Sequence, residues 1–273
     1  MRFETAPATP WLKLATKRGK LKDGQTVPAI TSEWPGAQSS TLAAYKDICG
    51  FASPGMPITW PQVLAAPVHI QMLASGEFPM PAMGIVHVSQ HITQHTELAD
   101  DDALDIQCAF VGQRQAKRGV ELDLKTTATI DGETVWEATT VFLSMAAKGH
   151  GKNNMAAIPV PERIERSAVW RVPEDLGRRY GTIAGDRNPI HQYAWSAKLF
   201  GFKRAIIHGM WTMARCCAEL DTPMASVETW FKRPVFMPGE VTFESGPLGD
   251  ATCFRLANPR DGKLHLYGTA TPR

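Results

Sequence analysis

A carboxylate and an imidazole stand five residues apart in the segment Tyr180–Ala197, which reads YGTIAGDRNPIHQYAWSA. They belong to Asp186 and His191, with Asn188 between them. Gly185 and the proline of this segment exclude a regular helix, so a turned loop can aim both side chains at one point. A carboxylate and an imidazole that converge on one water molecule form a general acid–base pair. The segment therefore predicts proton-transfer chemistry on a bound water.

A second group suited to catalysis follows at Ile207-His208-Gly209-Met210. The sequence of residues 209–220, GMWTMARCCAEL, predicts a helix, so the N–H of Gly209 would lie in its first turn. Amides there have no intrahelical acceptor, and the helix macrodipole favours negative charge beside them. We therefore expect Gly209 to stabilise an oxyanion, and Asn188 to tie the loop together or to help hold the ligand.

The G-D-x-N-P pattern also has a simpler interpretation, because Gly, Asp, Asn and Pro all favour ordinary turns. His191 in the same segment and the glycine-initiated helix downstream favour a functional site over a plain turn.

These residues resemble the signature of the MaoC-like family, the (R)-specific enoyl-CoA hydratases and 3-hydroxyacyl dehydratases of the hydratase 2 type. The family pattern is an aromatic residue, a small-residue step, then G-D-x-N-P-aliphatic-H, with a small residue six positions on. This sequence supplies Tyr180, Gly185, Asp186, Asn188, Pro189, Ile190, His191 and Ala197. Ala184 departs from the small polar residue or glycine usual in the family. The HGM segment and residues 233–240 extend the resemblance over most of residues 168–272.

The resemblance implies a hydro-lyase that adds water reversibly to a trans-2-enoyl thioester and forms the (R)-3-hydroxyacyl thioester. Asp186 would deprotonate the water, His191 would relay the proton, and the Gly209 N–H would hold the enolate oxygen. It implies that no metal or other cofactor is needed. The implied substrate is an acyl-CoA or acyl-carrier thioester. The candidate substrate-binding residues are Tyr180, Gly185, His208, Lys203 and Arg204, the last two as cations for the phosphates of CoA.

The elements predicted around the motif fall into two similar series. In the first, a helix over residues 60–75, disturbed at Pro67, precedes strands over 83–92, 104–111, 120–130 and 135–144. In the second, a strand over 168–172 and the helix over 209–220 precede strands over 226–236, 240–245, 252–257 and 264–270. A helix followed by antiparallel strands, given twice, favours an α+β fold. The resemblance implies a double hot-dog, two repeats that each wrap a sheet around a long central helix.

The segment Ala147–Pro161, AKGHGKNNMAAIPVP, has the composition of a linker. It predicts two domains, a non-catalytic repeat over residues 1–150 and a catalytic repeat over residues 151–273. The stretch Gly50–Pro61, which would correspond to the motif, contains neither Asp nor His, so one active site per chain is expected. The candidates for lining the acyl pocket are Phe51, Trp60, Met72 and Leu73.

Composition narrows the class of protein further. The 273 residues, 44 % of them apolar, can build two ordinary cores. No run approaches the roughly 20 apolar residues that span a bilayer, and the N-terminus lacks a signal-type apolar core, so a cytoplasmic protein is expected. A net charge of +2 does not favour nucleic-acid binding. The five cysteines form no C-x-x-C pair and are expected to be buried and reduced. A homo-oligomer is left open.

Three other signals favour structure over function. His87, His91 and His95 recur every four residues, but the alternation of GIVHVSQHI predicts a strand, which would not gather them on a metal. The segment 149–152 resembles a phosphate loop only faintly, with Asn153 in place of Ser or Thr. Cys216 lies within an apolar helix and is expected in the core.

Two other functions remain open beside the hydro-lyase. One is a thioesterase of the same fold, which would need no Asp and His at this spacing and would release a free thiol. The other is a non-catalytic module that binds acyl thioesters without turnover. Within the hydro-lyases, a specialised dehydratase for branched or dicarboxylic acyl groups is also compatible with the sequence.

Overall fold

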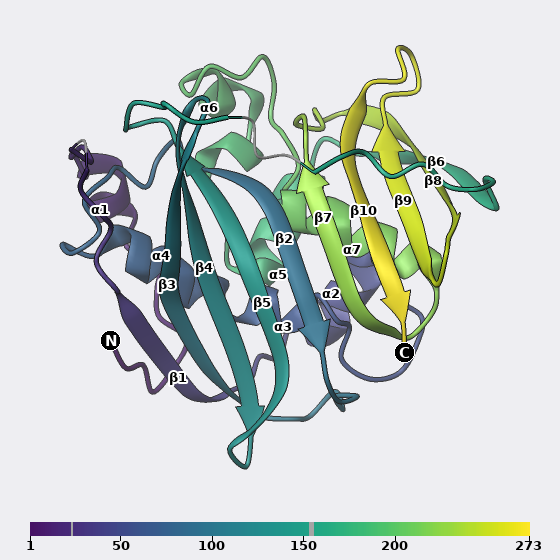
Figure 1. The fold of residues 1–273 in the computed structure, drawn as a ribbon, viewed down its shortest axis with the longest axis horizontal. Helices are drawn as coiled ribbons and strands as arrows, with labels where there is room; N and C mark the ends of the chain where they lie inside the picture. The colour runs from purple at the N-terminus through teal and green to yellow at the C-terminus, as the bar shows by residue number, and fades with distance from the viewer. Residues whose placement is uncertain (23, 153–155) are drawn as a thin grey trace.

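The computed structural model describes residues 1–22, 24–152 and 156–273. Its strands form one antiparallel sheet in the order β1-β3-β4-β5-β2-β7-β10-β9-β8-β6, curved around the helices (Figure 1). The strands are β1 (Thr31–Ala37), β2 (Val86–Gln94), β3 (Leu104–Ala116), β4 (Gly119–Ile130), β5 (Glu133–Ser144), β6 (Arg166–Val172), β7 (Met224–Phe231), β8 (Gly239–Leu248), β9 (Ala251–Ala257) and β10 (Leu264–Pro272). The α+β class expected from the sequence is confirmed.

The helices lie on the concave side of the sheet (Figure 1). They are α1 (Trp11–Thr16), α2 (Leu42–Cys49), α3 (Trp60–Leu64), α4 (Ala66–Ala74), α5 (Leu176–Ala184), the 3-10 turn η1 (Pro189–His191), α6 (Ala194–Lys198) and α7 (Gly209–Leu220). Their buried faces and the inward side chains of the strands form one continuous hydrophobic core. Among the described residues, no helix has the length and hydropathy needed to span a bilayer.

The two halves of the sheet have the same topology. Read from the outer edges inward, the orders are β1-β3-β4-β5-β2 and β6-β8-β9-β10-β7, with the helices of each half inserted before its innermost strand. The innermost strands, β2 and β7, pair from Ser89↔Trp230 to Thr93↔Ser226, and we call this pairing the seam. The domain boundary near residue 150 stays a prediction, and residues 153–155 of the expected linker lie outside the described residues.

Two elements end earlier than the sequence predicted. The helix expected over 60–75 breaks at Ala65, because Pro67 has no N–H for a continuous ladder and instead sits in the first turn of α4. The strand expected over 226–236 ends at Phe231, where the backbone amides of Lys232 and Arg233 both turn to the carbonyl of His265.

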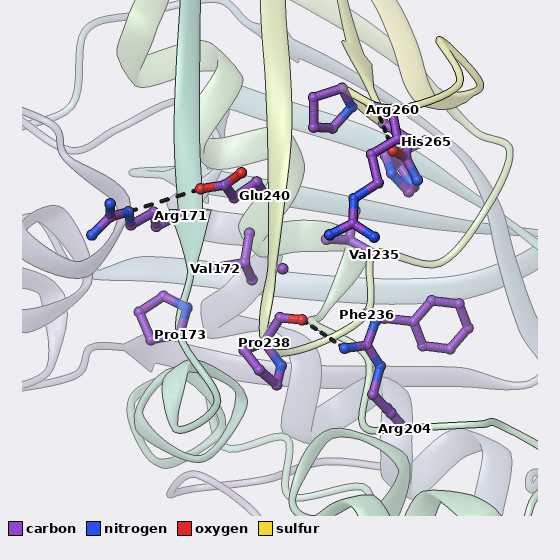
Figure 2. Close-up of a pocket in the computed structure, with 13 residues that line it drawn as sticks. Arg171, Val172, Pro173, Arg204, Val235, Phe236, Pro238, Glu240, Arg260 and His265 are labelled. Carbon is purple, nitrogen blue, oxygen red and sulfur yellow. Dashed lines mark hydrogen bonds and ion pairs between the residues drawn. The ribbon is translucent and has the colours of Figure 1, made fainter.

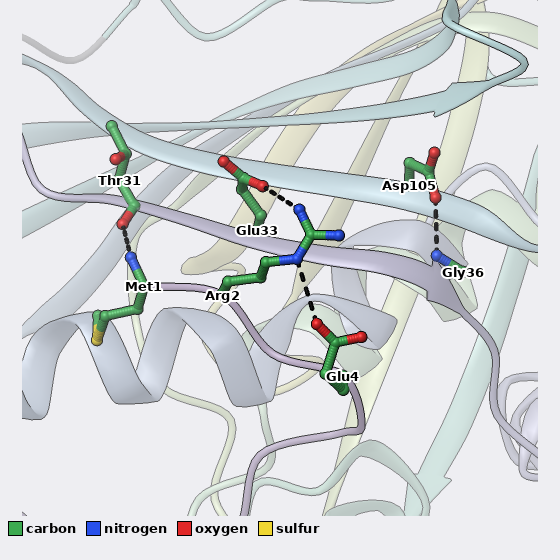
Figure 3. Close-up of polar contacts among 7 residues, drawn as sticks. All are labelled: Met1, Arg2, Glu4, Thr31, Glu33, Gly36 and Asp105. Atoms are coloured by element: carbon green, nitrogen blue, oxygen red, sulfur yellow. Dashed lines mark hydrogen bonds and ion pairs between the residues drawn. The ribbon is translucent and has the colours of Figure 1, made fainter.

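The N-terminus adds contacts to the outer edge of the first half. The terminal amine of Met1 donates to the Thr31 carbonyl at 2.7 Å, and Arg2 pairs with Glu4 and Glu33 (Figure 3). Exposed ion pairs contribute about 0–1 kcal/mol each. Backbone pairing of β1 with β3 is therefore the main attachment of this edge.

Candidate active site

Side-chain-to-backbone hydrogen bonds shape the loop that carries Asp186 and His191. Helix α5 ends at Gly185, whose φ of 72° is a left-handed cap that favours glycine. Asp186 Oδ1 then accepts the Asn188 N–H at 3.0 Å, and Asn188 Oδ1 accepts the Ile190 N–H at 3.3 Å. Asn188 thus caps the 3-10 turn that ends at His191, which gives it a part in fixing the loop.

Two glycines of α5, which the sequence analysis did not single out, let this loop pack back onto the helix. Gly177 and Gly181 lie one turn apart, on the same face of α5. A Cβ at Gly181 would lie 2.5 Å from the Asp186 carbonyl oxygen, and one at Gly177 would overlap the His191 carbonyl. The two glycines are four residues apart and precede the motif, and this spacing is the signal that could have identified them.

His191 is buried in a neutral, oriented form. Its Nδ1 lies 2.7 Å from the Ile206 carbonyl, and since a carbonyl can only accept, Nδ1 carries the proton and Nε2 is left as an acceptor. Burial lowers the pKa of His191, opposed in part by the charge of Asp186 and by the Ile206 carbonyl. Ligand atoms of His191 and Asp186 lie within 4.8 Å of each other, close enough for one water to bridge them, whereas His208 Nε2 lies 3.7 Å from Asp186 Oδ2. A neutral imidazole that shares a water with a carboxylate is suited to accept a proton from it.

His208 packs directly behind the pair. Its Nε2 donates to the backbone carbonyl of Asp186 at 2.9 Å, and its ring stacks on His191 with 3.7 Å between centroids. Burial, together with the neighbouring His191, lowers the pKa of His208. The buried ring of Tyr180 lies 4.9 Å from the His208 ring. His208 therefore contacts both Asp186 and His191, and Tyr180 packs against His208.

Gly209 is the first residue of α7, as the sequence predicted, so its N–H has no acceptor within the helix. A Cβ at this position would lie 3.2 Å from the ring of Phe231 at the end of β7. The helix N-terminus is thus pressed against the top of the seam, and it directly follows His208. A possible donor to an oxyanion thus follows directly on His208, whose ring stacks on that of His191.

The two cations predicted for the CoA phosphates take different positions. Both are exposed, and Arg204 also lines a surface cavity of about 710 Å³ at the edge of the second half (Figure 2). Arg204 donates to the Pro238 carbonyl at 3.0 Å and lies over the Phe236 ring. Arg171, Arg260 and His265 also line this cavity. Arg204 is two residues from Ile206, the hydrogen-bond partner of His191.

The first half has the same kind of helix cap without the same chemistry. Helix α2 ends at Gly50, a left-handed cap with φ of 81°, as α5 ends at Gly185. The following residues up to α3 include neither a carboxylate nor an imidazole. Of the expected pocket residues, Trp60, Met72 and Leu73 are buried in the shared core and Phe51 packs against it.

Ligand-type side chains of the site could also converge on a cation. Atoms of Asp186, His191 and His208 lie within 4.8 Å of one another.

The three regularly spaced histidines do not converge: His91 pairs with Glu228, His95 with Glu137, and His87 packs between aromatic rings. All five cysteines, Cys216 included, are buried and unpaired in the described structure.

Gly181→Ala should lower kcat about tenfold or more, although alanine is the better helix former. The new methyl group would push the Asp186 carbonyl away, and a misplacement of roughly 1 Å can cost about a hundredfold. Steady-state kinetics of the folded variant test this. Gly76→Ala, where a Cβ meets open space, is the matched control and should keep normal kinetics. An unchanged kcat in Gly181→Ala would show that the loop does not depend on this close approach.

Comparison with known proteins identifies the family of this chain independently of the site geometry. The family described as "MaoC like domain" matches residues 156–256. The 3-hydroxyacyl-thioester dehydratase X of Mycobacterium tuberculosis is 30 % identical over 245 residues, 88 % of each chain. The peroxisomal enoyl-CoA hydratase 2 of Arabidopsis thaliana is 25 % identical over 178 residues, 57 % of each chain.

Solved structures agree with the fold. The crystal structure of HtdX from Mycobacterium tuberculosis superposes with a TM-score of 0.76 at 29 % identity, covering 90 % of this chain and 100 % of that one. A conserved hypothetical protein of the same organism, described as having a double hotdog fold, gives a TM-score of 0.55 at 11 % identity, covering 94 % of this chain and 96 % of that one. The double hot-dog expected from the sequence is confirmed, and the chain belongs to the family of MaoC-like hydratases and dehydratases.

Proposed function

We propose that this protein catalyses the reversible addition of water to a trans-2-enoyl thioester, forming the (R)-3-hydroxyacyl thioester. The observation that carries the proposal is the neutral His191, its Nδ1 fixed on Ile206, with ligand atoms of His191 and Asp186 within 4.8 Å of each other, a separation that one water can bridge. The family of dehydratases and hydratases to which the chain belongs supports the same chemistry.

In the hydration direction, a water held between the Asp186 carboxylate and His191 Nε2 attacks C3 of the enoyl group. The pair takes one proton from this water as the C3–O bond forms. Negative charge develops on the thioester oxygen, where the Gly209 N–H stabilises it. The pair then delivers a proton to C2 of the enolate, so the elements of water are added across the double bond. Dehydration follows the same steps in reverse.

A panel of trans-2-enoyl thioesters of graded length, as CoA and carrier-protein forms, tests this function. Loss of the conjugated absorbance should report hydration, and chiral analysis should find the (R) alcohol. Release of free thiol without hydration would instead support a thioesterase. Tight binding without turnover would support a binding module, and an (S) product would contradict the proposed stereochemistry.

We further propose that the cavity beside Arg204 receives the phosphates of a CoA substrate. Arg204→Gln should raise KM for a CoA thioester about threefold to tenfold with little change in kcat, since a phosphate contact far from C3 affects binding. The same acyl group on pantetheine should be unaffected. Lys203→Gln, a change of an exposed cation outside the cavity lining, is the control. An equal loss with pantetheine would contradict a phosphate-binding role.

The division of labour between the halves also belongs to this proposal. Residues 151–273 would supply the acid–base pair and residues 1–150 would shape the acyl pocket, giving one active site per chain. Titration of a tight product analogue by calorimetry would count the sites. The cytoplasmic location and a homo-oligomer stay predictions.

A further inference from the structure

Four buried polar side chains meet at the seam, on the face that looks toward the helices. Gln90 of β2 lies directly across from Thr229 of β7 and, on its other side, from Thr140 of β5. Directly opposed residues of antiparallel strands point to the same face. Gln62 of α3 reaches down onto the same point, and all four side chains are at most 4 % exposed. We call this group the seam cluster.

The hydrogen bonds of the seam cluster are incomplete. Gln62 Nε2 donates to Thr140 Oγ1 at 2.8 Å, and Thr140 Oγ1 donates to Gln90 Oε1 at 2.9 Å. Gln62 Oε1, Gln90 Nε2 and Thr229 Oγ1 are buried without a hydrogen bond of normal geometry to any described residue, although the Gln90 side chain also lies within reach of His87. Turning either amide by 180° exchanges its oxygen and nitrogen but still leaves one free atom on each glutamine. Buried polar atoms are almost always paired, so three free ones in one place point to a ligand.

The cluster lies close to the helix N-terminus that carries Gly209. Phe231, whose ring contacts the Gly209 position, shares its face of β7 with Thr229. Alternate residues of a strand are about 7 Å apart, so Thr229 lies about one strand repeat beyond the end where the thioester carbonyl would bind. An acyl chain that leaves the Gly209 N–H and follows the seam past Phe231 therefore reaches the cluster. The His87 ring, 4.7 Å from Phe231, stands beside the same path.

The chemistry of the cluster restricts the group that it can receive. Its four side chains are uncharged amides and hydroxyls that offer both donors and acceptors. Burial lowers the pKa of the neighbouring His87 to about 4, against smaller opposing effects of the Ser89 carbonyl and Gln90, so His87 is neutral at pH 7. A buried carboxylate would find no cation among these five side chains, which disfavours a dicarboxylic acyl group. A hydroxyl or ketone would satisfy the free atoms at no such cost.

We propose that the acyl chain of the substrate carries an uncharged oxygen function, a hydroxyl or ketone several carbons beyond C3, that hydrogen-bonds Gln62, Gln90 and Thr229. This inference rests on the proposed hydro-lyase function and adds the substrate class to it. A site built to bond a substrate hydroxyl discriminates strongly against an analogue that lacks it, because its own polar atoms are then buried unpaired.

Matched pairs of trans-2-enoyl thioesters test the inference. Each pair has one chain length, with and without a hydroxyl on the distal part of the chain, and the hydroxyl position is moved along the series. For at least one position, kcat/KM should be about tenfold or more higher for the hydroxylated member. CoA and carrier-protein forms are both assayed, so that a carrier preference does not hide the effect.

Thr229→Val is the sharpest variant, because it keeps the shape and removes a hydroxyl for which the structure gives no partner. It should lower kcat/KM several-fold for the hydroxylated substrate, leave the alkyl substrate unchanged or improved, and leave the midpoint of thermal unfolding unchanged or raised. Ser32→Ala is the matched control: its hydroxyl is also buried and without a partner among the described residues, but it lies on the edge strand β1. Ser32→Ala should not change the ratio of kcat/KM between the hydroxylated and the alkyl substrate.

The outcomes separate the two proposals. Hydration of every pair with equal or lower kcat/KM for the hydroxylated member would overturn the polar acyl chain and leave the hydro-lyase intact. Equal losses for both substrates in Thr229→Val would do the same, since they would show a structural role for this residue. No hydration of any thioester would overturn the hydro-lyase, and this inference with it.

Discussion

Asp186→Asn is expected to lower kcat for hydration by at least about a hundredfold, the low end for loss of a general acid–base group. The amide cannot accept the proton of water, whereas its oxygen can still accept the Asn188 N–H that fixes the loop. The backbone carbonyl held by His208 is unchanged. The loss should therefore be chemical and should appear in kcat, measured by single-turnover hydration of an enoyl thioester.

Circular dichroism and thermal unfolding supply the control for Asp186→Asn. Both should match the wild-type protein, because the replacement is nearly isosteric and keeps the acceptor of the turn. Near-normal turnover in the folded variant would remove Asp186 from the mechanism.

His191→Ala should cause a loss of similar size, because it removes the Nε2 that shares the water with Asp186. It also removes the bond to the Ile206 carbonyl, which leaves a buried acceptor unpaired and should lower stability by about 1–3 kcal/mol. Kinetics are therefore compared at a temperature where thermal unfolding shows the variant to be fully folded.

The double variant, Asp186→Asn with His191→Ala, distinguishes one catalytic unit from two separate groups. Groups that act on one water as a unit give non-additive losses, so the double variant should be little slower than either single one. Multiplicative losses would show that the carboxylate and the imidazole act in different steps.

Elements with strong local patterns were predictable from the sequence. The helix Gly209–Leu220 has the predicted bounds, and the strand predicted over 120–130 differs from β4 by one residue, because apolar periodicity and flanking glycines determine them. The end of β7 was predicted five residues too late, since it depends on the His265 carbonyl of β10, a neighbouring strand that comes much later in the sequence. Helix α5 was not predicted, because two glycines in nine residues lower its helix propensity and two of the five residues on its buried face are these glycines.

The candidate site divides in the same way. Asp186 and His191 could be proposed from one short motif, since the chemistry and the turn formers lie in consecutive residues. The tautomer of His191 could not, because Ile206 reaches its Nδ1 only in the folded chain. The seam cluster was also beyond the sequence, as its members come from one helix and three strands, and each looks like an ordinary polar residue.

The seam has a consequence for the order in which the protein can be completed during synthesis. β2 pairs with β5 on one side, but its other side stays an open edge until the ribosome has added the chain as far as Phe231. An open edge strand can pair with another nascent chain, and unfinished multi-part proteins are prone to such misassembly. The first half is therefore prone to intermolecular strand pairing when it leaves the ribosome. A translational pause before β7 would prolong the exposure of the β2 edge.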